Sequence, residues 1–156
     1  MKLYRVYEDT EYIHLVTDYA TDGELFARIY KRKKFSEDVT KAFMKGMLET
    51  LDYLHNNGIV HRDLKPENVL MMSAVDDSKF TLADFGLAAY TLGPPLVLRC
   101  GSPGYVAPEI FKNEPYDSKV DVFSAGILMY IFLTGKAAFT GLDPHTILAN
   151  NKKGEI

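Results

Sequence analysis

Residues 61–70 read HRDLKPENVL, and this stretch places a carboxylate (Asp63), an ammonium group (Lys65) and an amide (Asn68) in one short loop. A carboxylate can orient a hydroxyl group and accept its proton, and an ammonium group can neutralise a phosphate oxygen. An amide oxygen can join a carboxylate in holding Mg²⁺, which prefers oxygen ligands. Phosphoryl transfer needs this combination because its catalysis consists mostly of positioning and charge neutralisation. Pro66 restricts the backbone of Lys65 and stiffens the loop.

Two further motifs follow in order along the chain. Residues 84–86 read DFG and residues 107–109 read APE. Because DFG comes directly after a predicted strand, we expect Asp84 to lie at a strand end, with Gly86 allowing a sharp turn of the backbone. A lone three-residue match is weak evidence, since it can arise by chance. The ordered series of HRDLKPEN, DFG and APE is far more specific.

The composition sets broad limits on the function. The chain has 156 residues, of which 47% are hydrophobic and 25% charged, with a net charge of -3. This length and composition are typical of a globular domain or part of one, and the mild acidity favours neither nucleic acid nor a membrane as a partner. Cys100 is the only cysteine, which excludes an internal disulfide and suits a reducing compartment. We therefore expect a cytoplasmic protein.

Hydrophobic periodicity predicts the order of the elements. The longest apolar stretch, residues 122–133, is shorter than the roughly 20 residues that a bilayer span needs, and it is expected to be a helix buried on all sides. Residues 1–9 read as the start of a strand rather than as a signal peptide. The predicted strands are 3–8, 12–19, 69–72 and 79–84; the predicted helices are 24–33, 36–57, 119–133 and 143–151, with a long loop over 84–109. This order predicts an α+β fold in which a small sheet leads into a mainly helical body.

The three motifs make the chain resemble the eukaryotic protein kinases. The resemblance implies the end of a small β lobe over 1–17, a hinge over 18–22 and an incomplete, mainly helical large lobe over 23–156. It also implies that Asp63 is the catalytic base and that Lys65 lies near the transferred phosphoryl group. Asn68 and Asp84 would hold Mg²⁺, and Gly86 would let the metal-binding loop change its state.

The same resemblance implies a site for ATP. The strand YIHLVTDY is similar to the last strand of the small lobe running into the hinge. Thr17 would then lie beside the adenine pocket, and the backbones of Asp18 and Ala20 would hydrogen-bond to adenine. Leu70 would form the floor of the pocket, a role compatible with ordinary core packing. The expected cofactors are ATP and Mg²⁺.

Substrate class has its own signals. Lys65, two residues after the base, and Ser102 in CGSPGYVAPE resemble serine/threonine kinases rather than tyrosine kinases. Glu24 and Glu67 occupy positions that contact a substrate arginine in relatives that prefer basic sequences, although Glu24 also suits the start of a helix. The chain looks most like the calcium/calmodulin-dependent and calcium-dependent kinases. That similarity implies a protein substrate with a Ser or Thr acceptor and a calcium- or calmodulin-linked regulator outside this chain.

The sequence departs from the family in several places. The Gly-rich loop, the strand lysine that binds phosphates and its partner glutamate are expected to precede residue 1, and the arginine that pairs with Glu109 is absent. Arg62 commonly grips a phosphorylated residue in the family, but Leu98 stands at the matching position. Tyr90 and Thr91 are less favourable phosphate sites because they lie close to DFG. These features predict an enzyme that needs no phosphate on this loop.

Two other functions compete with this interpretation. A truncated, catalytically incompetent kinase-like binding module would lack the phosphate-gripping half of the site, although residues 61–86 keep every chemical group of the other half. A small-molecule phosphotransferase would share the HxD-type loop and the later metal aspartate. Such enzymes generally lack the APE-ended segment that CGSPGYVAPE implies.

Overall fold

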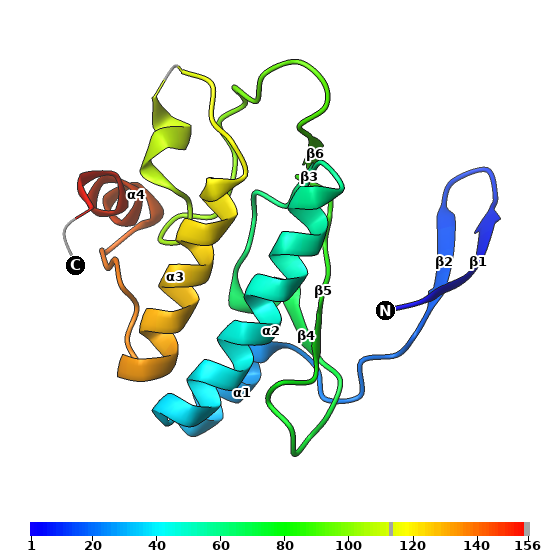
Figure 1. Ribbon diagram of the computed structural model, residues 1–156, viewed down its shortest axis with the longest axis horizontal. Coiled ribbons are helices and arrows are strands. Elements are labelled where there is room, and N and C mark those ends of the chain that lie inside the picture. Colours follow the sequence, from blue (N-terminus) through cyan, green and yellow to red (C-terminus); the bar gives the residue numbers. More distant parts are fainter. Residues whose placement is uncertain (113, 155–156) are drawn as a thin grey trace.

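The computed structural model describes residues 1–112 and 114–154 (Figure 1). It begins with an antiparallel hairpin of β1 (Leu3–Glu8) and β2 (Ile13–Thr17). The Asp9 carboxylate closes the turn, because its Oδ1 accepts hydrogen bonds of 2.8 Å from the backbone N–H groups of Glu11 and Tyr12. The predicted pair of strands is confirmed, with the second strand shorter than expected at both ends.

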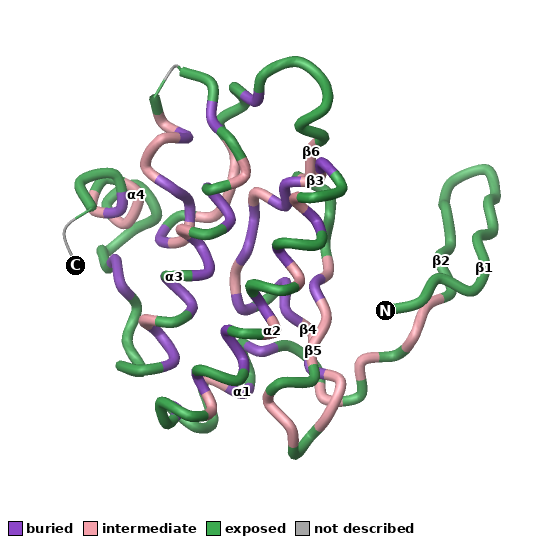
Figure 2. Tube along the Cα trace, viewed as in Figure 1, coloured by how far each residue is buried: buried purple, intermediate pink, exposed green. Residues whose placement is uncertain are grey.

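The hairpin extends away from the rest of the molecule (Figures 1 and 2). Every residue of β1 is exposed, and β2 is exposed up to the half-buried Thr17. Its aliphatic and aromatic side chains on both faces are therefore in solvent, and they include Leu3, Tyr4, Val6, Tyr7, Ile13 and Leu15. The hairpin adds nothing to the hydrophobic core of the body.

The body is built from helices α1 (Leu25–Arg32), α2 (Glu37–Asn56), α3 (Lys119–Thr134) and α4 (Pro144–Lys153). Ser36 caps α2, since its side chain accepts a hydrogen bond from the Val39 N–H, and Glu37 and Asp38 lie in the first turn. The Asp143 side chain caps α4 in the same way. All four predicted helices are confirmed.

The core lies where α1, α2 and α3 meet the strands that follow α2 (Figure 2). The ring of Phe132 on α3 stacks on Phe35 and Phe43, with centroid separations of 4.3 and 4.4 Å. Aliphatic side chains surround these rings, namely Leu25, Met47, Leu51, Leu64, Val69, Met71 and Leu128. This packing fixes the positions of the elements that carry the polar loop of residues 61–68.

Helix α3 is not buried on all sides, and that expectation was wrong. Val122, Met129 and Leu133 expose 47%, 43% and 40% of their surface, while Leu128 and Phe132 are fully buried. A helix that is apolar all round is normally covered all round. The uniformly apolar sequence hid the fact that only part of the helix surface faces the core.

Short strands frame the loops between α2 and α3. β3 (Ile59–Val60) pairs with β6 (Ala89–Tyr90), and β4 (Val69–Met71) pairs with β5 (Phe80–Leu82), both antiparallel. The strands thus form three separate two-stranded sheets rather than one small sheet. Two 3-10 turns, η1 (Pro66–Asn68) and η2 (Pro108–Phe111), complete the frame, and the predicted long loop carries only β6 and the start of η2. None of the described helices is long and apolar enough to cross a membrane.

Candidate functional site

Asp121 on α3 anchors the loop of residues 61–68, which follows β3. The fully buried Asp121 carboxylate accepts hydrogen bonds from the backbone N–H groups of His61 and Arg62, at 2.9 and 2.8 Å, and contacts His55 Nε2 at 2.9 Å. Arg62 has a φ of 68°, a left-handed conformation that costs a non-glycine residue about 1–2 kcal/mol. The Asp121 bonds offset this strain and set the direction in which the chain enters Asp63.

Three of the predicted site residues meet at the Asp63 carboxylate. Lys65 Nζ lies 2.8 Å from Asp63 Oδ2, and Ser102 Oγ donates a hydrogen bond of 2.7 Å to Asp63 Oδ1. Lys65 Nζ also donates to Ser102 Oγ at 2.9 Å, which closes a triangle. Asp63 is 7% exposed, so its polar groups are held largely out of water. The arrangement joins a loop next to β3 with one that lies almost forty residues further along the chain.

Asp63 is held in its anionic form. Burial alone would raise the pKa of its carboxyl group, but hydrogen bonds from Lys65 and Ser102 and the charge of Lys65 outweigh burial and lower the pKa below its ordinary value. A carboxylate that is ionised at neutral pH can accept a hydrogen bond from a hydroxyl group and take its proton. Ser102 already makes such a bond, which shows the geometry that an acceptor hydroxyl would need.

The Asn68 amide is oriented by Asp63. Its Nδ2 donates to the Asp63 carbonyl at 2.8 Å and to Asp63 Oδ2 at 3.2 Å. This leaves the amide oxygen of Asn68 available as a ligand. The Ala83 N–H donates to the Asn68 carbonyl at 2.9 Å, so the chain that carries the exposed Asp84 runs directly beside Asn68.

These two oxygen donors suit Mg²⁺ only together with phosphate. The described residues contain no group of three acidic, histidine or cysteine side chains that could hold a metal alone. Mg²⁺ is usually bound by one or two protein ligands, water and substrate phosphates. Asn68 and Asp84 therefore fit a metal that arrives with a nucleotide.

The DFG stretch turns sharply at Gly86, as expected, because the Ala88 N–H donates to the Phe85 carbonyl at 3.0 Å and closes a turn with Gly86 and Leu87 at its centre. The left-handed backbone angle lies one step earlier, on Asp84. Asp84 has a φ of 58°, whereas Gly86 is not among the residues with positive φ. The Gly86 N–H donates to Asp84 Oδ1 at 3.1 Å, and a Cβ at Gly86 would come within 3.0 Å of that same oxygen. Glycine therefore serves a close approach here rather than a special dihedral angle.

The His61 and Phe85 rings form a short stack with centroids 4.9 Å apart, and Asp121 holds the backbone of His61. Leu3 lies in the free hairpin with 53% of its surface exposed. Phe85 is itself 44% exposed, so the stack rests on the His61 end alone.

The predicted adenine-binding residues are spread along the link from the hairpin. Thr17 Oγ1 donates to the Asp18 carbonyl at 3.1 Å, and the Asp18 carboxylate accepts a 2.6 Å bond from Tyr4. The exposed Glu24 and the half-buried Leu70 form an isolated antiparallel bridge. No described bond joins Ala20, or any other residue of this set on the hairpin side, to Asp63, Asn68 or Asp84.

The two predicted substrate carboxylates are both exposed. Glu24 precedes α1 and Glu67 lies in η1, and neither makes an ion pair among the described residues. Burial and the nearby charge of Glu67 raise the pKa of Tyr105 to about 12. Glu109 is half-buried and likewise lacks an ion pair within the described part of the chain.

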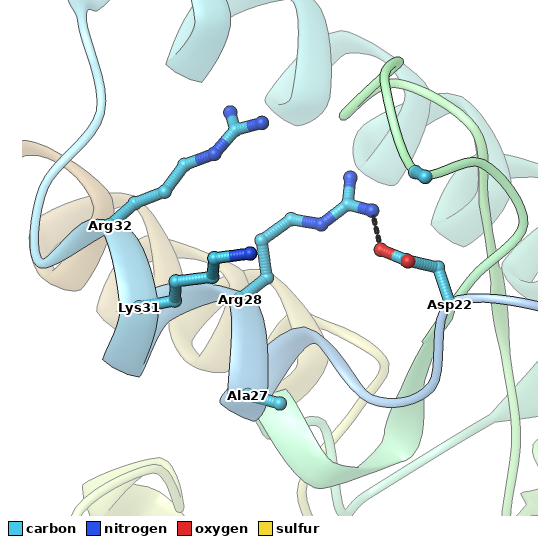
Figure 3. A pocket seen from close by; sticks show the side chains of 6 residues that line it. Asp22, Ala27, Arg28, Lys31 and Arg32 are labelled. Carbon is cyan, nitrogen blue, oxygen red and sulfur yellow. Dashed lines mark hydrogen bonds and ion pairs between the residues drawn. The ribbon is translucent and has the colours of Figure 1, made fainter.

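Ion pairs that were not predicted from the sequence connect helix α1 to the link before it and to the loop that contains Asp77. Arg28 on α1 is 7% exposed and pairs with Asp22, in the link before α1, and with Asp77 at 2.7 Å. Arg32 also pairs with Asp77. Figure 3 shows Asp22, Arg28 and Arg32 beside a cavity of about 310 Å³, which is lined by Asp22, Ala27, Arg28, Lys31, Arg32 and Ala74. No predicted site residue lines this cavity.

A second unpredicted contact lies beside the loop of residues 61–68. Arg62 Nη1 donates to the Tyr116 hydroxyl at 3.0 Å, and that hydroxyl donates to the Leu98 carbonyl at 2.6 Å. Nothing in the sequence near Tyr116 marks it as a site residue, because its partners lie 54 and 18 positions away and one of them is a backbone carbonyl.

Known proteins are similar to this chain over its whole length. Calcium/calmodulin-dependent protein kinase type 1 of Macrobrachium nipponense is 41% identical over the full chain, which covers 45% of that protein. Probable serine/threonine-protein kinase 2 of Plasmodium falciparum is 42% identical over the full chain, which covers 31% of it. Calcium-dependent protein kinase 5 of Plasmodium berghei is 45% identical over the full chain, which covers 28% of it.

The chain thus spans less than half the length of these relatives. A family model described as the protein kinase domain matches residues 1–155. The matched range includes the loop in which Asp63, Lys65 and Asn68 meet and the segment that brings Ser102 to them. The chain therefore belongs to the protein kinase family.

Proposed function

We propose that this chain carries the catalytic half of a serine/threonine protein kinase, which transfers the γ-phosphoryl group of ATP to a protein hydroxyl. The observation that carries the proposal is the anionic Asp63 carboxylate, which lies 2.8 Å from Lys65 Nζ and accepts a 2.7 Å bond from a hydroxyl group. Family membership and the names of the relatives support the same class of reaction.

The proposed step divides the work among four residues. The oxygen of the acceptor hydroxyl bonds to the γ-phosphorus, and Asp63 accepts the proton that this hydroxyl loses. At the same time the bond between the γ-phosphorus and the bridging oxygen breaks, and that oxygen leaves as part of ADP. Lys65 neutralises charge on the phosphoryl oxygens. Asn68 and Asp84 would hold Mg²⁺, which supplies charge neutralisation at the β- and γ-phosphates when it is bound.

Further parts of the proposal concern ATP and the setting. Adenine would be surrounded by Thr17, the backbones of Asp18 and Ala20, and Leu70, once the hairpin packs with the rest of a small lobe. The division into the end of a small lobe (1–17), a hinge (18–22) and a large lobe (23–156) is part of the same proposal. The lone Cys100 supports a reducing, cytoplasmic setting.

We further propose a protein substrate with basic residues near its Ser or Thr. The support is the exposure of Glu24 and Glu67, which are carboxylates without ion-pair partners among the described residues. Such groups attract a substrate arginine without a prior bond having to break. The names of the relatives support a calcium- or calmodulin-linked regulator in the complete protein.

An acceptor panel tests the proposed reaction. The complete protein that contains this chain, with MgATP, should phosphorylate a basic Ser peptide, and should leave the matched Ala peptide and a set of small alcohols unmodified. Mass spectrometry of the products identifies the acceptor. Modification of the small alcohols alone would point to a small-molecule phosphotransferase, and no transfer to any acceptor would favour a kinase-like binding module.

A further inference from the structure

The loop of residues 61–68 contains a cation, Arg62, whose side-chain hydrogen bonds among the described residues all go to neutral partners. Arg62, which precedes the proposed base, is half-buried and makes no ion pair within residues 1–112 and 114–154. Its Nε donates to the Leu87 carbonyl at 2.7 Å, and its Nη1 donates to the Tyr116 hydroxyl at 3.0 Å. A half-buried guanidinium gives up hydration, so these two oxygen acceptors decide where it lies.

Tyr116 connects Arg62 to the long loop of residues 84–109. Its hydroxyl donates to the Leu98 carbonyl at 2.6 Å, and its backbone N–H donates to the Leu96 carbonyl at 3.0 Å. The side chain is rigid because Tyr116 is only 8% exposed and belongs to a core cluster with Leu96, Val106 and Ile110. The hydroxyl is therefore a fixed point for the chain around Leu98, whose own side chain is 58% exposed.

Arg62 and Tyr116 contact opposite ends of the segment between DFG and residues 100–109. Leu87 directly follows DFG, and Leu98 precedes Ser102, whose Oγ bonds to Asp63, by four residues. The Tyr116 hydroxyl must keep its proton to donate to Leu98. Burial raises the pKa of Tyr116 above its ordinary value, although the hydrogen bond from Arg62 opposes this, so the hydroxyl is a phenol at neutral pH.

We propose that Tyr116 is a positioning residue, whose hydroxyl joins Arg62 to the Leu98 carbonyl. This link holds the segment of residues 98–102 at the position where Ser102 contacts Asp63, and it does so without a phosphate on the segment. The inference rests on the proposed kinase function. A phosphate on a loop orders it by pairing with arginine. Here a neutral hydroxyl buried in the core gives Arg62 its partner, and Leu98 offers no hydroxyl that could be phosphorylated.

The test compares the wild type with Tyr116→Phe in the complete protein, after phosphatase treatment checked by intact mass. Phenylalanine keeps the ring in the core and removes only the hydroxyl. The dephosphorylated wild type should retain full activity. Tyr116→Phe should lower kcat/KM for the basic Ser peptide about tenfold, as expected for a hydrogen bond to a charged group, and should change KM for ATP less than about twofold. Tyr53→Phe, an exposed position on α2, is the matched control and should behave as wild type.

A double-mutant cycle separates positioning from general destabilisation. Because Tyr116 acts through Arg62, adding Tyr116→Phe to an Arg62→Gln variant should lower peptide kcat/KM by less than about threefold more. Losses that multiply, or a Tyr116→Phe variant with wild-type kinetics, would overturn the proposal. If Tyr116→Phe does not fold, unaltered peptide kinetics in Arg62→Gln would overturn it instead.

The phosphorylation state decides the remaining outcomes. A wild type that transfers phosphate only when its loop is phosphorylated would overturn the role of Tyr116 and leave the kinase function standing. A wild type that is inactive towards every acceptor in both states would overturn the kinase function and this inference with it.

Discussion

At the scale of single residues, the site depends on a carboxylate that is buried yet kept ionised. Asp63 sits at 7% exposure with Lys65, Ser102 and Asn68 all donating hydrogen bonds to it. Each donor is itself positioned by a second contact, as when Lys65 also bonds to Ser102. Removal of any donor should shift the Asp63 pKa towards its ordinary value, because burial alone acts in the opposite direction.

The lowered pKa of Asp63 predicts how stability depends on pH. A carboxyl group whose pKa is lower in the folded state stabilises the fold above its unfolded value of about 3.9, and this contribution is lost as pH falls through the folded value. The difference in unfolding free energy between the wild type and Asp63→Asn should therefore be constant above about pH 5 and shift against the wild type below about pH 3.9. Urea denaturation across pH measures it. A difference that moves in favour of the wild type on acidification would contradict the predicted sign.

The sequence was most informative where residues that are close in the chain also contact one another in the candidate site. Asp63, Lys65 and Asn68 were predicted from one decapeptide, and the structure brings them together with Ser102. Tyr116 was missed because it acts through a backbone carbonyl and a cation far away in sequence, and no local pattern records such contacts. The turn at Gly86 was predicted, whereas the positive φ of Asp84 was not, because no local pattern marks a non-glycine residue for such an angle.

At the scale of elements, helix α3 anchors the loop of residues 61–68. Its Asp121 carboxylate binds two consecutive backbone N–H groups and His55, which joins α2, α3 and the loop at one buried point. The helices themselves were predictable, since caps such as Ser36 and apolar periodicity are local signals. The exposed side of α3 was not, because a uniformly apolar helix carries no periodic signal to show which face is uncovered.

Replacing Asp121 with alanine tests this anchoring. Asp121→Ala leaves two buried backbone N–H groups without acceptors and a strained Arg62 without support, so the free energy of unfolding should fall by about 2–5 kcal/mol. Urea denaturation of the complete protein provides the measurement. Asp52→Ala, an exposed carboxylate on α2, is the control and should change the free energy by less than about 0.5 kcal/mol. Equal effects of the two substitutions would show that Asp121 does not anchor the loop.

At the scale of the whole molecule, the chain combines a mainly helical body with a hairpin that stands apart from it (Figure 1). The α+β class and the order of the elements were predictable from periodicity and turn residues. The separation into three two-stranded sheets was not, because strand pairing depends on contacts between distant segments. The cluster around Arg28 escaped prediction for the same reason, since Asp77 lies 49 residues away.

The central claim is that Asp63 takes the proton of a protein hydroxyl during phosphoryl transfer. The most direct test is single-turnover transfer from MgATP to a basic Ser peptide by the complete protein, with nucleotide binding measured in parallel. Asp63→Asn should slow transfer by about 10²–10⁴-fold, the range of general base catalysis, and leave nucleotide affinity largely intact. An Asp63→Asn variant that binds nucleotide and transfers phosphate at the wild-type rate would contradict the account.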